Sequence, residues 1–114
     1  MKVVEFSRAC AQPIEEFESA AAASVHLGDG AGEAHVYCIH LGPGGRIGEH
    51  PAGFGQLFLV VEGRAWAAGA DGRRVQLGAG QGAYFARGEM HSKGSDAGAT
   101  AIMVQVSELV TEAP

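Results

Sequence analysis

Glycine interrupts this sequence at short intervals and limits the length of any regular element. Eighteen of the 114 residues are glycine, and from His35 onward they separate apolar runs of three to eight residues. The runs cover residues 35–41, 56–61, 64–68, 73–77, 83–85 and 100–107. Runs of strand length that end in turn residues are typical of β-sandwiches and β-barrels, and so many glycines disfavour a helical bundle. Asp71 and Gly72 also predict a tight hairpin turn.

Size, charge and cysteine content narrow the class of protein. The length predicts one domain, and 46% hydrophobic with 18% charged residues is typical of a folded chain. The net charge of −5 disfavours nucleic-acid binding because it repels phosphates. No apolar run is long enough for a secretion signal or a membrane span, and Cys10 and Cys38 are far apart in sequence. We expect a cytoplasmic protein with two free thiols and no membrane partner.

The N-terminal part of the chain is compatible with two structures. Residues 13–24 have the proline start, early carboxylates and alanines of a helix, whereas residues 19–27 could run as a strand. We favour a strand from Ser19 to Leu27, because the remaining strands need partners in a sheet. The expected organisation is a lead-in over residues 1–18, a barrel domain over residues 19–107 and a C-terminal tail over residues 108–114.

Two of the five histidines follow glycine-rich turns. His50 comes after GPGGRIGE and precedes the run that begins at Gln56, and His91 ends the segment GAGQGAYFARGEMH. Histidine titrates near neutral pH and is the most frequent transition-metal ligand in proteins. His35 and His40 are five residues apart, so regular pleating sends them to opposite faces of a strand. His50 and His91 are therefore the main candidates for a functional site.

These segments resemble the two motifs of the cupin superfamily. The first motif, G(X)5HXH(X)3-4E(X)6G, aligns with Gly44, His50, Ala52, Gln56 and Gly63, and the second, G(X)5PXG(X)2H(X)3N, with Gly80, Ala86, Gly88, His91 and Ser95. Alanine replaces the second histidine and the proline, glutamine replaces the glutamate, and serine replaces the asparagine. The resemblance implies a single-domain, all-β double-stranded β-helix, also called a jelly-roll barrel.

The resemblance also implies a metal site, because three histidines and one glutamate hold a divalent ion in metal-binding cupins. The matching residues here are His50, Gln56 and His91. We expect any divalent ion to be held weakly, since a glutamine brings no charge and one imidazole is missing. Two other roles stay open for the histidines, namely hydrogen bonding to an organic ligand and structural hydrogen bonding at strand ends.

Alternation along residues 56–61 predicts which side chains face the interior. If Gln56 points inward, Phe58 does too, so we expect His50, Gln56, Phe58 and His91 to bind a ligand. Leu57 and Leu59 then face outward and need cover from the N-terminal segment or a second copy. We expect a homodimer. The predicted function is a barrel that binds a small organic molecule, with a metal-dependent oxygenase, isomerase or lyase as the alternative.

Overall fold

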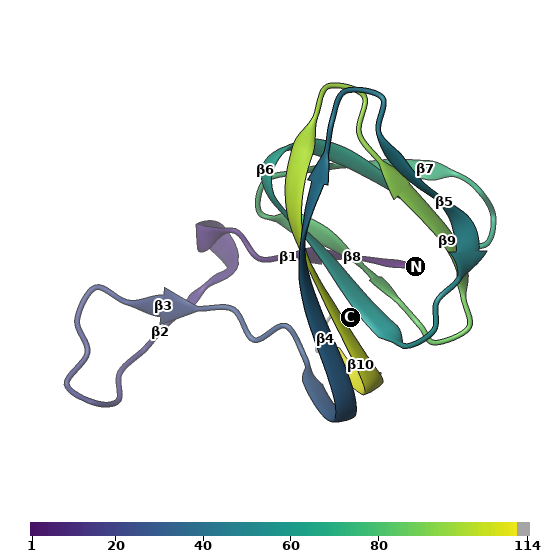
Figure 1. Cartoon of the computed structure of the whole chain (residues 1–114). Helices are drawn as coiled ribbons and strands as arrows, with labels where there is room; N and C mark the ends of the chain where they lie inside the picture. The colour runs from purple at the N-terminus through teal and green to yellow at the C-terminus, as the bar shows by residue number, and fades with distance from the viewer. Residues whose placement is uncertain (112–114) are drawn as a thin grey trace.

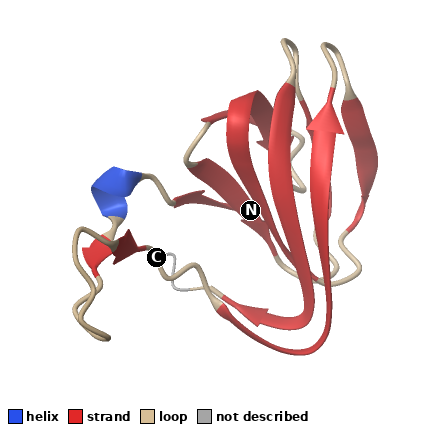
Figure 2. Ribbon diagram, turned by 60° about the vertical axis from the view of Figure 1, so that its left-hand side comes forward, coloured by secondary structure: helices blue, strands red, loops and turns tan. Residues whose placement is uncertain are grey.

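Eight strands form one barrel in the computed structural model, which describes residues 1–111. They are β1 (Lys2–Glu5), β4 (Asp29–Leu41), β5 (Arg46–Pro51), β6 (Gly55–Ala68), β7 (Arg74–Gly78), β8 (Gln81–Phe85), β9 (Met90–Gly94) and β10 (Ala99–Val110). Figure 1 shows the strands wrapped around a common interior, and in Figure 2 strands make up most of the molecule. The expectation of an all-β double-stranded β-helix is confirmed.

Strand β6 connects the two halves of the barrel. Its first part pairs with β8 and β10, and its second part pairs with β7 and β9. One half has the strand order β1-β8-β6-β10-β4, and β5 completes the other half by pairing with β9. The hairpin predicted at Asp71 and Gly72 joins β6 to β7, and Gly72 has a φ of 72°. The left-handed conformation at this glycine is the one that a tight hairpin turn requires.

A bulge in β6 changes which side chains face the interior. The register with β10 shifts at Val61, and Gly63 follows with a φ of 78°. Before the bulge Phe58 packs in the core, and after it Ala65 does, although the two are an odd number of residues apart. The extra residue therefore reverses the alternation, which keeps Trp66 out of this core cluster.

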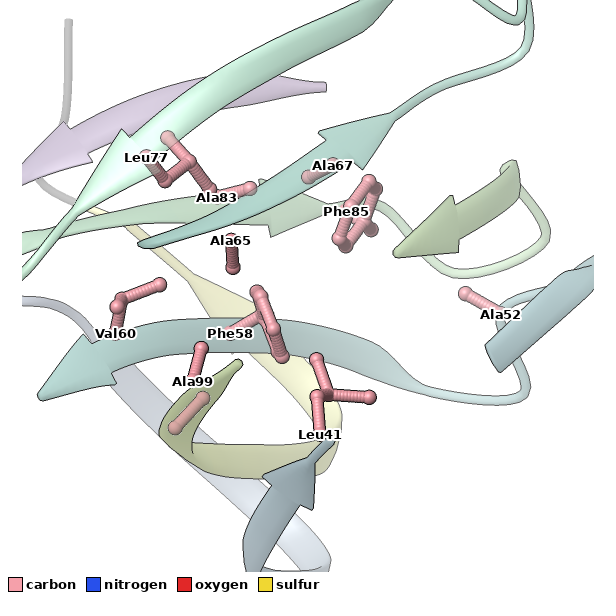
Figure 3. Packing of buried hydrophobic residues seen from close by; sticks show 11 residues of the cluster. Leu41, Ala52, Phe58, Val60, Ala65, Ala67, Leu77, Ala83, Phe85 and Ala99 are labelled. Carbon is pink, nitrogen blue, oxygen red and sulfur yellow. The ribbon is translucent and has the colours of Figure 1, made fainter. Parts of the chain in front are cut away.

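The core fills the space between the two halves of the barrel with small aliphatic side chains and two phenyl rings (Figure 3). Its buried members are Leu41, Ala52, Phe58, Val60, Ala65, Ala67, Leu77, Ala83, Phe85, Ala99 and Ala101. Phe58 and Phe85 are fully buried. Burying a side chain of this size contributes about 1.5–3 kcal/mol to stability, so the rings are the main anchors of the core.

The outer face of β6 is covered by the chain itself. Leu57 and Leu59 are only 4% and 8% exposed, because Val4, Phe6 and Leu27 pack against them. The N-terminal segment thus supplies the cover that the alternation required. These two leucines therefore give no reason to expect a second copy of the chain.

Residues 7–28, which we call the N-terminal arm, leave the barrel and form a separate hairpin (Figure 1). The arm contains the 3-10 turn η1 (Arg8–Cys10) and the short strands β2 (Gln12–Pro13) and β3 (Ala23–Ser24). The prediction of a strand over residues 19–27 is wrong. Phe17, Glu18 and Ala21 have φ values of 60°, 56° and 52°, and these left-handed residues turn the chain back so that β3 pairs with β2 instead of the barrel.

The barrel strands also differ from the expected domain boundaries. Strand β1 lies within the expected lead-in and pairs with β8, and β10 continues past Ser107 to Val110. Both ends remain strand because each has a partner, β8 for β1 and β4 for β10. Residues 112–114 of the expected tail lie outside the described part of the chain. Within residues 1–111, no helix has the length and apolar character needed to cross a membrane.

Candidate functional site at one end of the barrel

A second bulge aims His50 into the barrel. On β5, Ile47 pairs with Lys93 and His50 pairs with His91, so three steps along β5 match two along β9. Ile47 packs against the core. Regular alternation would point His50 the other way, and the extra residue returns it to the inner face. Of the segment GPGGRIGE, which the sequence analysis treated as a glycine-rich turn, residues 42–45 are a turn and residues 46–49 belong to the bulged strand.

His50 and His91 are in direct contact. Their Nε2 atoms are 3.2 Å apart, and the rings meet edge to face with centroids 4.5 Å apart. His91 is fully buried, whereas His50 is exposed. The pair therefore joins the barrel interior to solvent.

The hydrogen bonds around the pair assign its protons. The Nδ1 of His50 donates to the carbonyl oxygen of Gly48 at 2.7 Å, because a carbonyl can only accept. A neutral His50 then has a lone pair on Nε2, so the Nε2 of His91 is the donor. The Nδ1 of His91 remains a buried acceptor with no partner within residues 1–111. A buried acceptor of this kind can receive a hydrogen bond from a bound molecule.

The surroundings of His91 keep it neutral. Its pKa is lowered from 6.5 to about 4, mainly by burial and in addition by the nearby charges of Lys93 and His50, whereas Glu89 acts in the opposite direction. Burial disfavours the charged form of a base. At neutral pH His91 can therefore donate and accept hydrogen bonds but carries no charge.

Lys93 is a buried cation in the same interior. Its side chain is 1% exposed, and its Nζ donates to the Oε1 of Gln56 and contacts the Sδ of Met103 at 3.7 Å. The ammonium lies 5.4 Å from the ring centroid of Phe58 and 5.3 Å from that of Phe85. Burial lowers the pKa of Lys93 to about 8. Most molecules therefore still carry this charge at pH 7.

An aromatic rim lies near the histidine pair. His35 stacks on Tyr37 and on Phe54, with centroids 6.3 Å and 5.8 Å apart, and the guanidinium of Arg87 is 5.8 Å from the Phe54 centroid. His35 shares its register with Gln105 of β10, which in turn pairs with Gln56. His35 therefore lies on the inner face of its strand, at the level of the buried glutamine.

The four expected ligand-binding residues occupy related positions. His50 and His91 touch, Gln56 and Phe58 contact Lys93, and all but His50 are buried. The buried ring of Phe85 lies between the two groups of residues: it packs against His91 at a centroid distance of 4.5 Å and also contacts Lys93. Lys93 was missed, although a usable signal was present. It lies two residues after His91, so alternation places both on one face of β9.

Comparison with known families is consistent with this architecture. The family model described as the AraC-like ligand-binding domain matches residues 33–111, which is more than half of the chain. The chain belongs to this family. The AraC-like domain is of the cupin type, so the resemblance seen in the motifs is confirmed. No match was found among curated proteins.

Solved structures show the same fold for this AraC-like domain. An RmlC-like cupin from Methanocaldococcus jannaschii has a TM-score of 0.62 and 11% identity, with 86% of this chain and 89% of that chain covered. A cupin superfamily protein from Desulfitobacterium hafniense has a TM-score of 0.61 and 10% identity, over 95% and 100%. A Cupin 2 conserved barrel protein from Salinispora arenicola has a TM-score of 0.58 and 24% identity, over 64% and 62%. Identities this low show the fold alone.

The donor set of this AraC-like domain does not fit a resident metal ion. Two Nε2 atoms 3.2 Å apart could occupy neighbouring positions around one ion, whose bonds to nitrogen are about 2 Å long. The third expected ligand, Gln56, already accepts from the ammonium of Lys93, a cation that would repel a divalent ion. Residues 1–111 contain no cluster of three or more histidine, cysteine or acidic side chains that could hold a metal. Weak binding of a divalent ion remains a prediction.

Proposed function

We propose that the protein is a binding module that takes up a small organic molecule at the His50 end of its barrel. The observation that carries this proposal is the buried His91, whose Nδ1 has no partner within residues 1–111 and whose Nε2 contacts the exposed His50. A small molecule that reached this pair from solvent would contact polar groups set in an apolar wall, which is the usual composition of a ligand site.

Membership of a ligand-binding family supports the same function. The alternative, a metal-dependent enzyme, has less support because Gln56 is engaged by Lys93 and no carboxylate of residues 1–111 joins the two histidines in a cluster. The cysteines Cys10 and Cys38 are both free, which fits the reducing cytoplasm that we propose as its compartment.

A nuclear magnetic resonance screen of small organic fragments tests this function. His50→Ala removes the exposed half of the pair, and His40→Ala is the matched control because His40 is also exposed on a barrel strand but pairs with Thr100 at the other end of β4. We expect fragments that shift the His50 and His91 ring signals to lose affinity in His50→Ala and to keep it in His40→Ala. Equal binding to both variants would contradict the proposed site.

We also propose that a second copy of the chain covers the N-terminal arm. An isolated two-stranded hairpin is marginally stable in water, and every residue of β2 and β3 is exposed. Phe17, at 90% exposure, adopts the left-handed conformation that costs a non-glycine residue about 1–2 kcal/mol. A groove of about 700 Å³, lined by Phe6, Arg8, Ala11, Pro13 and residues 21–25 and 27, runs along the arm and offers a receiving surface.

A further inference from the structure

The charge of Lys93 is not paired with a counter-charge from any of the described residues, 1–111. None of the ion pairs formed within residues 1–111 includes Lys93, and its Nζ contacts only a neutral amide and a thioether. An ammonium that loses water without gaining a carboxylate is costly to bury, even above phenyl rings. A cation in this state is better explained by an anion that arrives from outside than by a role in stability.

One hydrogen-bond donor of Lys93 remains available. The ammonium has three N–H groups, of which Gln56 receives one and the weak acceptor Met103 receives another. The carboxylates close to this end of the barrel are engaged elsewhere. Glu89 accepts from the amino group of Met1 and from the backbone N–H of Ala86. No acidic side chain of the described residues therefore competes for the third donor.

The aromatic rim near the histidine pair carries a second positive charge. Arg87 is exposed and lies over Phe54, and the acidic residue Glu33 pairs with His35 of the rim. The guanidinium of Arg87 attracts negative charge although the whole chain carries a net charge of −5.

On the basis of the proposed function, we propose that the ligand is a small organic anion whose carboxylate binds the free donor of Lys93. The carboxylate lies against the ammonium and the amide of Gln56, and the remainder of the molecule extends toward His50 and the aromatic rim. A charge-assisted hydrogen bond of this kind is stronger than a neutral one and selects acids over their amides.

Lysine signals can test this inference without overlap, because Lys2 and Lys93 are the only lysines in the sequence. Labelling lysine with carbon-13 gives one Cε signal from the exposed Lys2 and one from the buried Lys93. We titrate the intact protein with a fragment library in which each carboxylic acid is paired with its primary amide. We expect acids to shift the Lys93 signal, to leave that of Lys2 unchanged and to bind at least about tenfold more tightly than their amides.

Variants separate this inference from the proposed function. Lys93→Met keeps the length of the side chain and removes its charge, and Lys2→Met is the matched control. We expect Lys93→Met to abolish the preference for acids and Lys2→Met to preserve it. If amides bind as tightly as acids at His50 and Lys93→Met changes nothing, the carboxylate inference is overturned and the binding function stands. If no fragment shifts the His50, His91 or Lys93 signals, the proposed function itself fails.

Discussion

The Nε2 atoms of His50 and His91 lie 3.2 Å apart although 41 residues separate them in sequence. The bulge in β5 makes this contact possible, because it turns His50 onto the inner face opposite its register partner. The pair joins exposed and buried parts of the barrel. It is thus the structural basis of the proposed ligand site.

Removing one residue from the bulge should separate the two histidines. Deletion of Glu49, which is exposed, restores regular pairing between β5 and β9 and turns His50 outward. We expect the ring signals of His50 and His91 to lose their mutual nuclear Overhauser contacts while the signals of β6 and β10 persist. Contacts that survive the deletion would show that the bulge does not position His50.

Stability should rise with pH in the range where Lys93 loses its proton. Its pKa is about 8 in the folded protein and 10.5 ordinarily, so between these values the unfolded chain binds more protons and deprotonation favours folding. We expect about 2 kcal/mol more stability near pH 9.5 than near pH 7.5 from this group. Urea unfolding of the natural chain and of Lys93→Met measures the effect. The variant should lack the rise, and an equal rise in both would contradict the burial of this charge.

Acid should destabilise the protein through His91. Its folded pKa of about 4 lies below the ordinary 6.5, so below pH 6.5 the unfolded chain binds the additional proton and stability falls with pH. The expected loss from this group is about 2 kcal/mol between pH 7 and pH 4.5. Urea unfolding of the natural chain and of His91→Gln, which cannot gain a charge, measures how much of the stability lost in acid comes from His91. The same acid loss in both proteins would show that His91 is protonated as easily when folded.

Zinc should bind weakly, and Lys93 should be the main reason. The combined change Gln56→Glu and Lys93→Met adds a carboxylate beside the histidine pair and removes the competing cation. We expect this variant to bind zinc at least about tenfold more tightly than the natural chain, because the carboxylate adds a third, negatively charged ligand to the two neutral imidazoles. Calorimetric titration compares the two. Tight binding by the natural chain would mean that its ligands include groups other than those found here.

The N-terminal arm should hold a homodimer together. Phe17→Asp places a charge at the most exposed apolar position of the arm, and Met90→Asp, at an exposed position on β9, is the control. We expect light scattering to give a dimer for the natural chain and the control, and a monomer for Phe17→Asp. A natural chain that is monomeric at high micromolar concentration would refute the assembly.

The sequence predicted the barrel because its glycines and apolar runs mark local structure. It did not predict β5 and β9, because their glycine and charged residues do not form an apolar run. These two strands are stabilised by pairing with each other. The structure of the arm was predicted wrongly because its alanine-rich segment is compatible with a helix and with a strand. Left-handed residues such as Phe17 also leave no signal in the sequence. The motifs identified His50 and His91. The position of Lys93 two residues after His91 indicated the inner face of β9, but the burial of its charge depends on the packing of Phe58 and Phe85 around it.

The most direct measurement of the proposed function is a crystal structure of the protein soaked with the fragment that binds most tightly in solution. Our account predicts density for the fragment at the His50 end of the barrel, in contact with the histidine pair and reaching toward Lys93. Density confined to the groove of the N-terminal arm, with the His50 and His91 rings unchanged and free of ligand, would contradict it.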